Sequence, residues 1–130
     1  MFQKIKIRTF KKKSGILIPL EFKKSFPIKV KRFFYIYGSK NYIRADHAHK
    51  KCSQLFVPIF GKIELKYINK LEKGKVILDH KNNEAILLKP NNWCTIKFIT
   101  NNTILMVICD RYYEVNDYID NYKKFLKSIK

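Results

Sequence analysis

Residues 42–68 read YIRADHAHKKCSQLFVPIFGKIELKYI, and apolar segments follow one another in this stretch with only short breaks between them. The segments 42–49, 53–60 and 62–68 are short and rich in β-branched and aromatic residues, which favours strands over helices. The pair Phe60-Gly61 is a turn signal between the last two segments. The stretch therefore predicts consecutive β-strands that are joined by tight turns.

The same pattern continues on both sides of this stretch. Turn signals rich in Gly, Asn, Pro and Lys separate further short apolar segments. We expect additional strands at 2–9, 15–20, 31–37, 75–79, 84–89, 93–98 and 103–109. Many short strands at this spacing indicate a sandwich or a barrel, of which the jelly roll is one common form. The predicted fold class is therefore all-β.

The C-terminal segment has a different period. Tyr118, Tyr122, Phe125 and Ile129 recur at intervals of four, three and four residues, which is typical of one face of a helix. Asn116 or Asp117 would cap its start. We therefore expect an amphipathic C-terminal helix whose apolar face packs on the sheet.

Length and composition limit the domain organisation and the cellular context. With 130 residues, 46% of them hydrophobic, the chain is long enough for one buried core and is expected to form a single domain over 1–130. The cysteines Cys52, Cys94 and Cys109 are odd in number and far apart, so they are interpreted as free thiols. The chain has no apolar run of about 18 residues. We expect a cytoplasmic protein without a membrane partner.

The net charge of +18 raises a second class of function. Such a charge attracts polyanions, and 15% aromatic residues leave open a nucleic-acid-binding β domain. The lysines, however, are spread along the whole chain, whereas nucleic-acid-binding domains gather basic residues beside exposed stacking aromatics. We therefore expect no nucleic-acid partner.

The candidate functional site centres on residues 44–50, RADHAHK. Alternation along a strand places His47 and His49 on one face. If that face lines a cavity, Tyr35 and Tyr37 of the preceding strand, at the same two-residue period, would lie with them in a polar site within an apolar cup. Two histidines in a strand, taken alone, are equally compatible with a structural role.

The residues that follow the histidines make this site more specific. HxH, then Gln54, then Gly61 resembles the first cupin motif, with Gln in place of its acidic metal ligand. The region of the second motif, 88–95, contains no histidine, and His80 lies in a turn-like segment where a surface position is expected. Two imidazoles and an amide oxygen make a poor first-row metal site, so we expect neither a metal nor another cofactor. A metal-binding cupin, acting as an oxygenase, isomerase or sensor, stays open as an alternative.

Most of the chain resembles the sugar nucleotide 3,4-ketoisomerases, a family of metal-independent cupins. The resemblance rests on residues 34–37, on 44–61, on 90–93 and on 113–119, where the pattern YExxDYI is its most specific element. The chain departs from the family at Ala45, where the family usually has Gly, and at Asp46, where it has a basic or small residue. The resemblance implies a cupin jelly-roll β-barrel with a C-terminal helix.

The resemblance also implies a reaction and site residues. The carbonyl of a dTDP-linked 4-keto-6-deoxyhexose would move from C4 to C3 through an enediol. His49 would be the base that removes the proton from carbon, His47 its partner and Tyr35 the third catalytic group. Residues expected to bind substrate are Arg44, Tyr37 and Gln54. An epimerase of nucleotide sugars on the same fold is the alternative reaction.

Partners follow from the same resemblance. The family forms homodimers, often by exchange of an N-terminal strand, and its product is used by an aminotransferase that acts on the new C3 ketone. Trp93 is expected to pack in the core, since a single Trp in a β domain most often does so.

Overall fold

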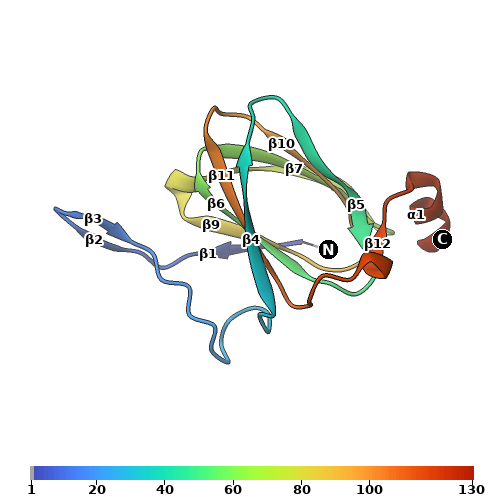
Figure 1. The fold of residues 1–130 in the computed structure, drawn as a ribbon, viewed down its shortest axis with the longest axis horizontal. Helices are drawn as coiled ribbons and strands as arrows, with labels where there is room; N and C mark the ends of the chain where they lie inside the picture. The colour runs from blue at the N-terminus through green and yellow to red at the C-terminus, as the bar shows by residue number, and fades with distance from the viewer. Residues whose placement is uncertain (1) are drawn as a thin grey trace.

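The computed structural model describes residues 2–130 and consists mainly of two five-stranded antiparallel sheets that face each other (Figure 1). The first sheet has the order β1-β9-β6-β11-β4. Its strands are β1 (Phe2–Lys6), β4 (Arg32–Gly38), β6 (Gln54–Phe60), β9 (Glu84–Leu88) and β11 (Thr103–Cys109).

The second sheet has the order β12-β5-β10-β7-β8. Its strands are β5 (Ile43–His49), β7 (Lys62–Ile68), β8 (Lys73–Asp79), β10 (Trp93–Phe98) and β12 (Tyr118–Ile119). From β4 to β11, the chain crosses to the other sheet after every strand except β7, which pairs with β8 in the second sheet. This is the order of a jelly roll, and it confirms the predicted all-β class. No strand pair within residues 2–130 joins the two sheets, so the expected barrel is an open sandwich.

Smaller elements lie outside the sandwich. The strands β2 (Phe10–Lys12) and β3 (Gly15–Leu17) pair with each other as a hairpin that projects from the body in Figure 1. Short 3-10 turns occur at His80–Asn82 and Val115–Asp117, and helix α1 spans Tyr122–Ser128. Among the described residues, no helix is long and apolar enough to cross a bilayer.

The predicted strands agree well with the structure in the centre of the chain and less well at its beginning. The strands predicted at 62–68, 93–98 and 103–109 have the observed bounds. The first strand ends at Lys6 instead of residue 9, and the strand predicted at 15–20 ends at Leu17. Both differences arise because Phe10–Lys12 leaves the sheet to form the projecting hairpin.

The C-terminal helix begins later than predicted. It starts at Tyr122, and the side chain of Asn121, not that of Asn116 or Asp117, accepts the capping hydrogen bond from the Lys124 N–H at 3.0 Å. Tyr118 lies in β12 instead of the helix and pairs with β5. Asp117 cannot cap the helix because its carboxylate is engaged with β5 and the loop after it.

Three apolar clusters hold these layers together. The main core lies between the sheets and includes Phe56, Leu65, Ile96 and Leu105. A second cluster on the outer face of the first sheet is covered by apolar residues of segment 20–30. A third packs α1 on the outer face of the second sheet through Ala48, Trp93 and Phe125.

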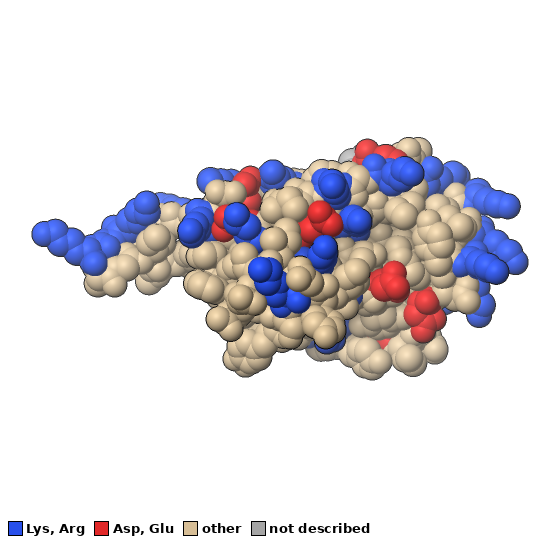
Figure 2. Space-filling view, turned by 90° about the horizontal axis from the view of Figure 1, so that it is seen from above, with Lys and Arg blue, Asp and Glu red and all other residues tan. Residues whose placement is uncertain are grey.

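Basic side chains are distributed over the molecule. On the face shown in Figure 2, Lys and Arg lie along the projecting hairpin, across the middle of the body and at its far end, with uncharged areas between them. They do not gather in one groove on this face.

Candidate active site

Strand β5 carries both histidines toward the space between the sheets. Ala48 packs under α1 on the outer face, so its neighbours His47 and His49 point inward, as alternation predicted. A β-bulge precedes them: Thr95 pairs with Ala45 and Cys94 with His47, which leaves Asp46 as the extra residue. Asp46 accepts a hydrogen bond from the Trp93 indole at 3.1 Å, and Ala45 and Asp46 have φ of 68° and 61°. The bulge thus sets the inward direction of the histidines.

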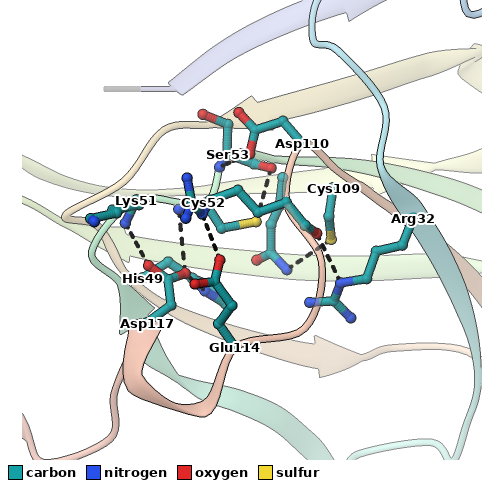
Figure 3. Close-up of polar contacts among 11 residues, drawn as sticks. Arg32, His49, Lys51, Cys52, Ser53, Cys109, Asp110, Glu114 and Asp117 are labelled. Carbon is teal, nitrogen blue, oxygen red and sulfur yellow. Dashed lines mark hydrogen bonds and ion pairs between the residues drawn. The ribbon is translucent and has the colours of Figure 1, made fainter.

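His49 is held by Asp117 (Figure 3). Its Nδ1 lies 2.8 Å from Asp117 Oδ2, and both side chains are buried. The carboxylate also accepts hydrogen bonds from the backbone N–H of Lys51 at 2.7 Å and of Cys52 at 3.3 Å. Burial alone would raise the pKa of Asp117, but the bonds from His49 and Lys51 outweigh it and lower the pKa. The carboxylate is therefore ionised and can only accept.

This acceptor fixes the tautomer of His49. Because an ionised carboxylate has no proton to give, the imidazole proton lies on Nδ1 and the lone pair on Nε2. His49 Nε2 is buried and has no hydrogen-bond partner. Burial lowers the pKa of His49, although Asp117 opposes this effect. The ring is consequently neutral near pH 7, with a free basic nitrogen.

His47 and Tyr118 complete the aromatic surroundings of this nitrogen. The His47 ring centroid lies 5.1 Å from that of His49, and the Tyr118 ring lies 4.9 Å from His47 and 4.4 Å from His49. Burial and the proximity of His49 lower the pKa of His47. Two neutral imidazoles and one phenol therefore form one compact aromatic group.

Arg32 supplies a positive charge on the opposite sheet. Its guanidinium lies 5.3 Å from the ring centre of Phe34 and 5.7 Å from that of Tyr113, and its Nε donates to the Arg111 carbonyl at 3.2 Å. Burial would lower the pKa of Arg32, but a hydrogen bond with Tyr118 raises it. Its charge in turn lowers the pKa of His49.

The prediction that Tyr35 and Tyr37 share a cavity with the histidines is wrong. Phe34 and Ile36 pack in the core between the sheets, so alternation along β4 turns both tyrosines outward, where they are 59% and 76% exposed. Their rings contact each other at 5.7 Å. Both faces of this strand carry apolar or aromatic residues, so the sequence alone does not show which face points inward.

The remaining predicted residues have mixed outcomes. Gln54 is buried on β6, and its Nε2 donates to Cys109 Sγ at 3.5 Å. Arg44 is exposed. Trp93 packs against α1, as expected, with its ring 5.6 Å from Phe125. His80 is half-buried instead of at the surface, and its Nδ1 accepts from the Gly61 N–H at 2.9 Å.

The three cysteines are free and buried. Cys52 Sγ donates to the Ser53 carbonyl at 3.4 Å. Contact with Cys52, together with the hydrogen bond from Gln54, lowers the pKa of Cys109 to about 7, whereas burial raises that of Cys94 to about 12. The pKa of Cys52 is raised, chiefly by its contact with Cys109.

One group of side chains in the described part of the chain is close enough to share a metal ion. It consists of His49, Cys52 and Asp117, whose ligand atoms all lie within 4.8 Å of one another. His47 is not part of this group, so it differs from the two-histidine site of the metal-binding cupin alternative. Gln54 stands where the first cupin motif has its acidic ligand, and residues 88–95 contain no histidine.

Sequence reasoning missed Asp117, Tyr118 and Arg32. The pattern YExxDYI, the most specific element of the family resemblance, contains Asp117 and was the available signal for it. Arg32 has the same parity as Phe34 and Ile36, so a correct choice of the inward face would have found it.

Comparisons with known proteins show which chains this one is similar to. The TDP-4-oxo-6-deoxy-alpha-D-glucose-3,4-oxoisomerase of Aneurinibacillus thermoaerophilus is 30% identical over 134 residues, which cover 95% of this chain and 94% of that protein. The crystal structure of a 3,4-ketoisomerase from Helicobacter canadensis superposes with a TM-score of 0.91 at 27% identity, covering 98% of this chain and 96% of that one.

Two further structures bear on the ligand and on the fold. A mutant of the 3,4-ketoisomerase QdtA from Thermoanaerobacterium thermosaccharolyticum, in complex with TDP-4-keto-6-deoxyglucose, has a TM-score of 0.91 at 26% identity over 98% of this chain and 93% of that chain. A dTDP-4-dehydrorhamnose 3,5-epimerase from Bacillus anthracis, at 16% identity, covers 90% of this chain and 76% of that one and shares the fold with a TM-score of 0.79. The family model described as FdtA, WxcM-like, C-terminal matches residues 2–130, and the chain belongs to this family.

Proposed function

We propose that the protein is a sugar nucleotide 3,4-ketoisomerase, which moves the carbonyl of a dTDP-linked 4-keto-6-deoxyhexose from C4 to C3. The observation that carries this proposal is the free Nε2 of His49, whose tautomer Asp117 fixes through Nδ1. The family membership and the 3,4-oxoisomerase that is 30% identical support the same reaction. The reaction is an isomerisation, so the enzyme needs proton transfers but no net redox partner.

His49 acts as the carbon base. The 4-keto group acidifies the C3 proton, and a neutral imidazole close to pH 7 has a suitable basicity for its removal. Removal gives an enediolate, and return of the proton to C4 leaves the carbonyl at C3. His47, whose ring is next to that of His49, transfers protons between the sugar oxygens. The oxygen on C3 loses its proton to become a carbonyl, and the oxygen on C4 gains one to become a hydroxyl.

The enediolate oxygens need donors, and the expected donor Tyr35 points outward. Tyr118 contacts the ring of His49, and Arg32 is close enough to lower the pKa of His49. They carry a phenol hydroxyl and a permanent positive charge. We assign these two residues the role of stabilising the negative charge that develops on the enediolate. Such electrostatic stabilisation is commonly among the largest contributions to catalysis. Gln54 stays a proposed contact to the sugar or to a histidine, and the exposed Arg44 is a proposed contact to the diphosphate.

The proposal is tested by proton NMR in D₂O of dTDP-4-keto-6-deoxyglucose with purified metal-free protein, and with His49→Asn and His80→Asn beside it. Wild-type protein should give a 3-keto product with deuterium at C4. His49→Asn should lose the product, because it removes the base, while His80→Asn, altered at the far hairpin turn, should keep it. An unchanged substrate spectrum with wild-type protein would refute the ketoisomerase.

The same experiment separates the alternative reaction. An epimerase on this fold would invert a carbon and incorporate deuterium there without moving the carbonyl. Product analysis at C3, C4 and C5 therefore distinguishes the two reactions. The epimerase structures share only the fold with this chain, and we favour the ketoisomerase because all of the more similar proteins named above carry that activity.

The proposed partners follow from the reaction. A new C3 ketone is the substrate type of an aminotransferase, so we place such an enzyme next in the sequence of reactions. We also propose that the protein is a homodimer, that it works in the cytoplasm and that it binds neither nucleic acid nor membrane. Three free thiols and basic residues spread over the surface are compatible with this assignment.

A further inference from the structure

A thiol lies beside the proposed base, and the reaction does not need it. Cys52 follows His49 by three residues, and its backbone N–H donates to the carboxylate that holds His49 (Figure 3). Its Sγ, a ring nitrogen of His49 and a carboxylate oxygen of Asp117 all lie within 4.8 Å of one another. Nitrogen, thiolate and carboxylate are the three kinds of ligand that zinc prefers in proteins.

The spacing of these atoms is close to that of a tetrahedral zinc site. Zinc binds imidazole at about 2.0–2.1 Å, carboxylate at about 2.0–2.2 Å and thiolate at about 2.3 Å, so neighbouring ligand atoms lie about 3.3–3.6 Å apart. His49 Nδ1 and Asp117 Oδ2, now 2.8 Å apart, would separate by about half an ångström. Cys52 Sγ has to approach and release its proton to solvent, which requires it to give up both its 3.4 Å bond to the Ser53 carbonyl and its contact with Cys109.

Part of this ligand set is already oriented. The Asp117 carboxylate is fixed by two backbone N–H groups, and these bonds persist when its Oδ2 turns from a proton to a metal ion. Anchored ligands of this kind bind metal more tightly than mobile ones. Three protein ligands leave a fourth position for water, as in zinc sites with an open coordination position.

We propose that His49, Cys52 and Asp117 form an inhibitory Zn²⁺ site. The metal would replace the proton between His49 Nδ1 and Asp117 Oδ2. A neutral imidazole with metal on Nδ1 carries its proton on Nε2, so the free lone pair is lost and the ring no longer accepts a proton from carbon. The inhibition, but not the binding, rests on the proposed function of His49.

Binding is measured directly with Co²⁺, which replaces Zn²⁺ in such sites and reports its ligands by absorption. We expect metal-free wild-type protein to bind one Co²⁺ with a thiolate-to-cobalt charge-transfer band, and Zn²⁺ to displace it. Cys52→Ala should lose the band and weaken Zn²⁺ binding at least about tenfold. Loss of a residue that only hydrogen-bonds to a metal ligand already weakens binding by about 10- to 100-fold, and Cys52 would be a ligand itself. Cys94→Ala, which removes an equally buried thiol outside the cluster, should keep both.

Absence of the charge-transfer band in wild-type protein, or its survival in Cys52→Ala, would overturn the site. Because the wild-type spectrum decides this point, a poorly folded variant does not leave the proposal untested. In the activity assay, Zn²⁺ should lower kcat without raising KM, since it removes the base and leaves the sugar nucleotide site open. Unchanged kcat at saturating Zn²⁺ would overturn the proposed inhibition. Metal-free protein without activity would refute the proposed ketoisomerase function, and the Co²⁺ spectrum alone would then decide whether the metal site exists.

Discussion

At the scale of single residues, the chemistry of the site depends on which nitrogen of His49 carries the proton. Asp117, held by two backbone N–H groups, accepts from Nδ1 at 2.8 Å and leaves Nε2 buried and unpaired. An unpaired buried nitrogen costs stability, and in a native protein such a group is explained by a function. The contact between Asp117 and His49 therefore indicates that Nε2 is ready to accept a proton before the substrate binds.

The first prediction at this scale concerns the orientation of His49. In Asp117→Asn the side-chain amide can donate to Nδ1 and so favour the tautomer with the proton on Nε2. We expect kcat to fall by about 10²- to 10⁴-fold with little change in KM. Asp110→Asn is the control, because Asp110 accepts from the Ser53 N–H at 2.8 Å, a bond that an Asn oxygen preserves. A folded Asp117→Asn protein with kcat within tenfold of wild type would contradict the role of Asp117.

The second prediction concerns pH. Burial lowers the pKa values of both His47 and His49 below 6.5, and Arg32 lowers that of His49 further while Asp117 opposes the shift. A general base works in its neutral form, which exists above its pKa, so activity is lost as pH falls through the lowered value. We expect the acidic limb of kcat/KM, which reports the free enzyme, to have its midpoint below pH 6.5. A midpoint at or above 6.5 would show that neither buried histidine is the base.

At the scale of elements, the sequence predicted the strands that form the sandwich and the direction of β5, because periodicity and turn residues are local signals. It did not predict that Asp117 leaves the helix to support His49, since this contact joins residues 68 positions apart. It also did not decide which face of β4 points inward, because Phe34, Ile36, Tyr35 and Tyr37 are all suited to a core. The burial of each face depends on the neighbouring sheet and not on the strand itself.

A prediction at this scale concerns the bulge that aims the histidines. Ala45 has a φ of 68°, in the left-handed region where Gly lacks the penalty of a Cβ. We expect Ala45→Gly to raise the free energy of unfolding by about 1 kcal/mol, the cost of this conformation for a residue with a Cβ. Ala48→Gly, in the same strand without a positive φ, should instead lower it by about 0.5–1 kcal/mol.

The pair is compared by urea unfolding followed by circular dichroism. If Ala45→Gly destabilises the protein as Ala48→Gly does, then Ala45 is not strained in solution and the bulge does not have the geometry described. A gain in stability with unchanged kcat would show that the direction of His47 and His49 is set by the bulge itself, whichever residue occupies position 45.

At the scale of the whole molecule, one chain leaves apolar surface uncovered. The hairpin β2–β3 projects from the body (Figure 1). Its side chains Phe10, Ile16 and Leu17 are exposed. An isolated two-stranded hairpin is at best marginally stable in water. Beside its base lies a mainly apolar groove of about 570 Å³ whose lining includes Val57 and Met106 on the outer face of the first sheet. Hairpin and groove are complementary in character, and two copies of the chain can cover each other's apolar surface.

The last prediction therefore concerns the oligomeric state. We expect the protein to sediment as a dimer at micromolar concentration in about 150 mM salt, where screening limits the repulsion between two chains of charge +18. Leu17→Glu places a carboxylate on the 62%-exposed apolar side chain of β3 and should shift the equilibrium toward monomer, because its burial in an interface would cost the desolvation of a charge. Ser14→Glu, at the polar tip of the same hairpin, lowers the net charge by the same single unit and should leave the dimer intact. Sedimentation of wild-type protein as a monomer would mean that the hairpin is not an interface, and dissociation by both variants would mean that net charge, instead of apolar contact, governs the association.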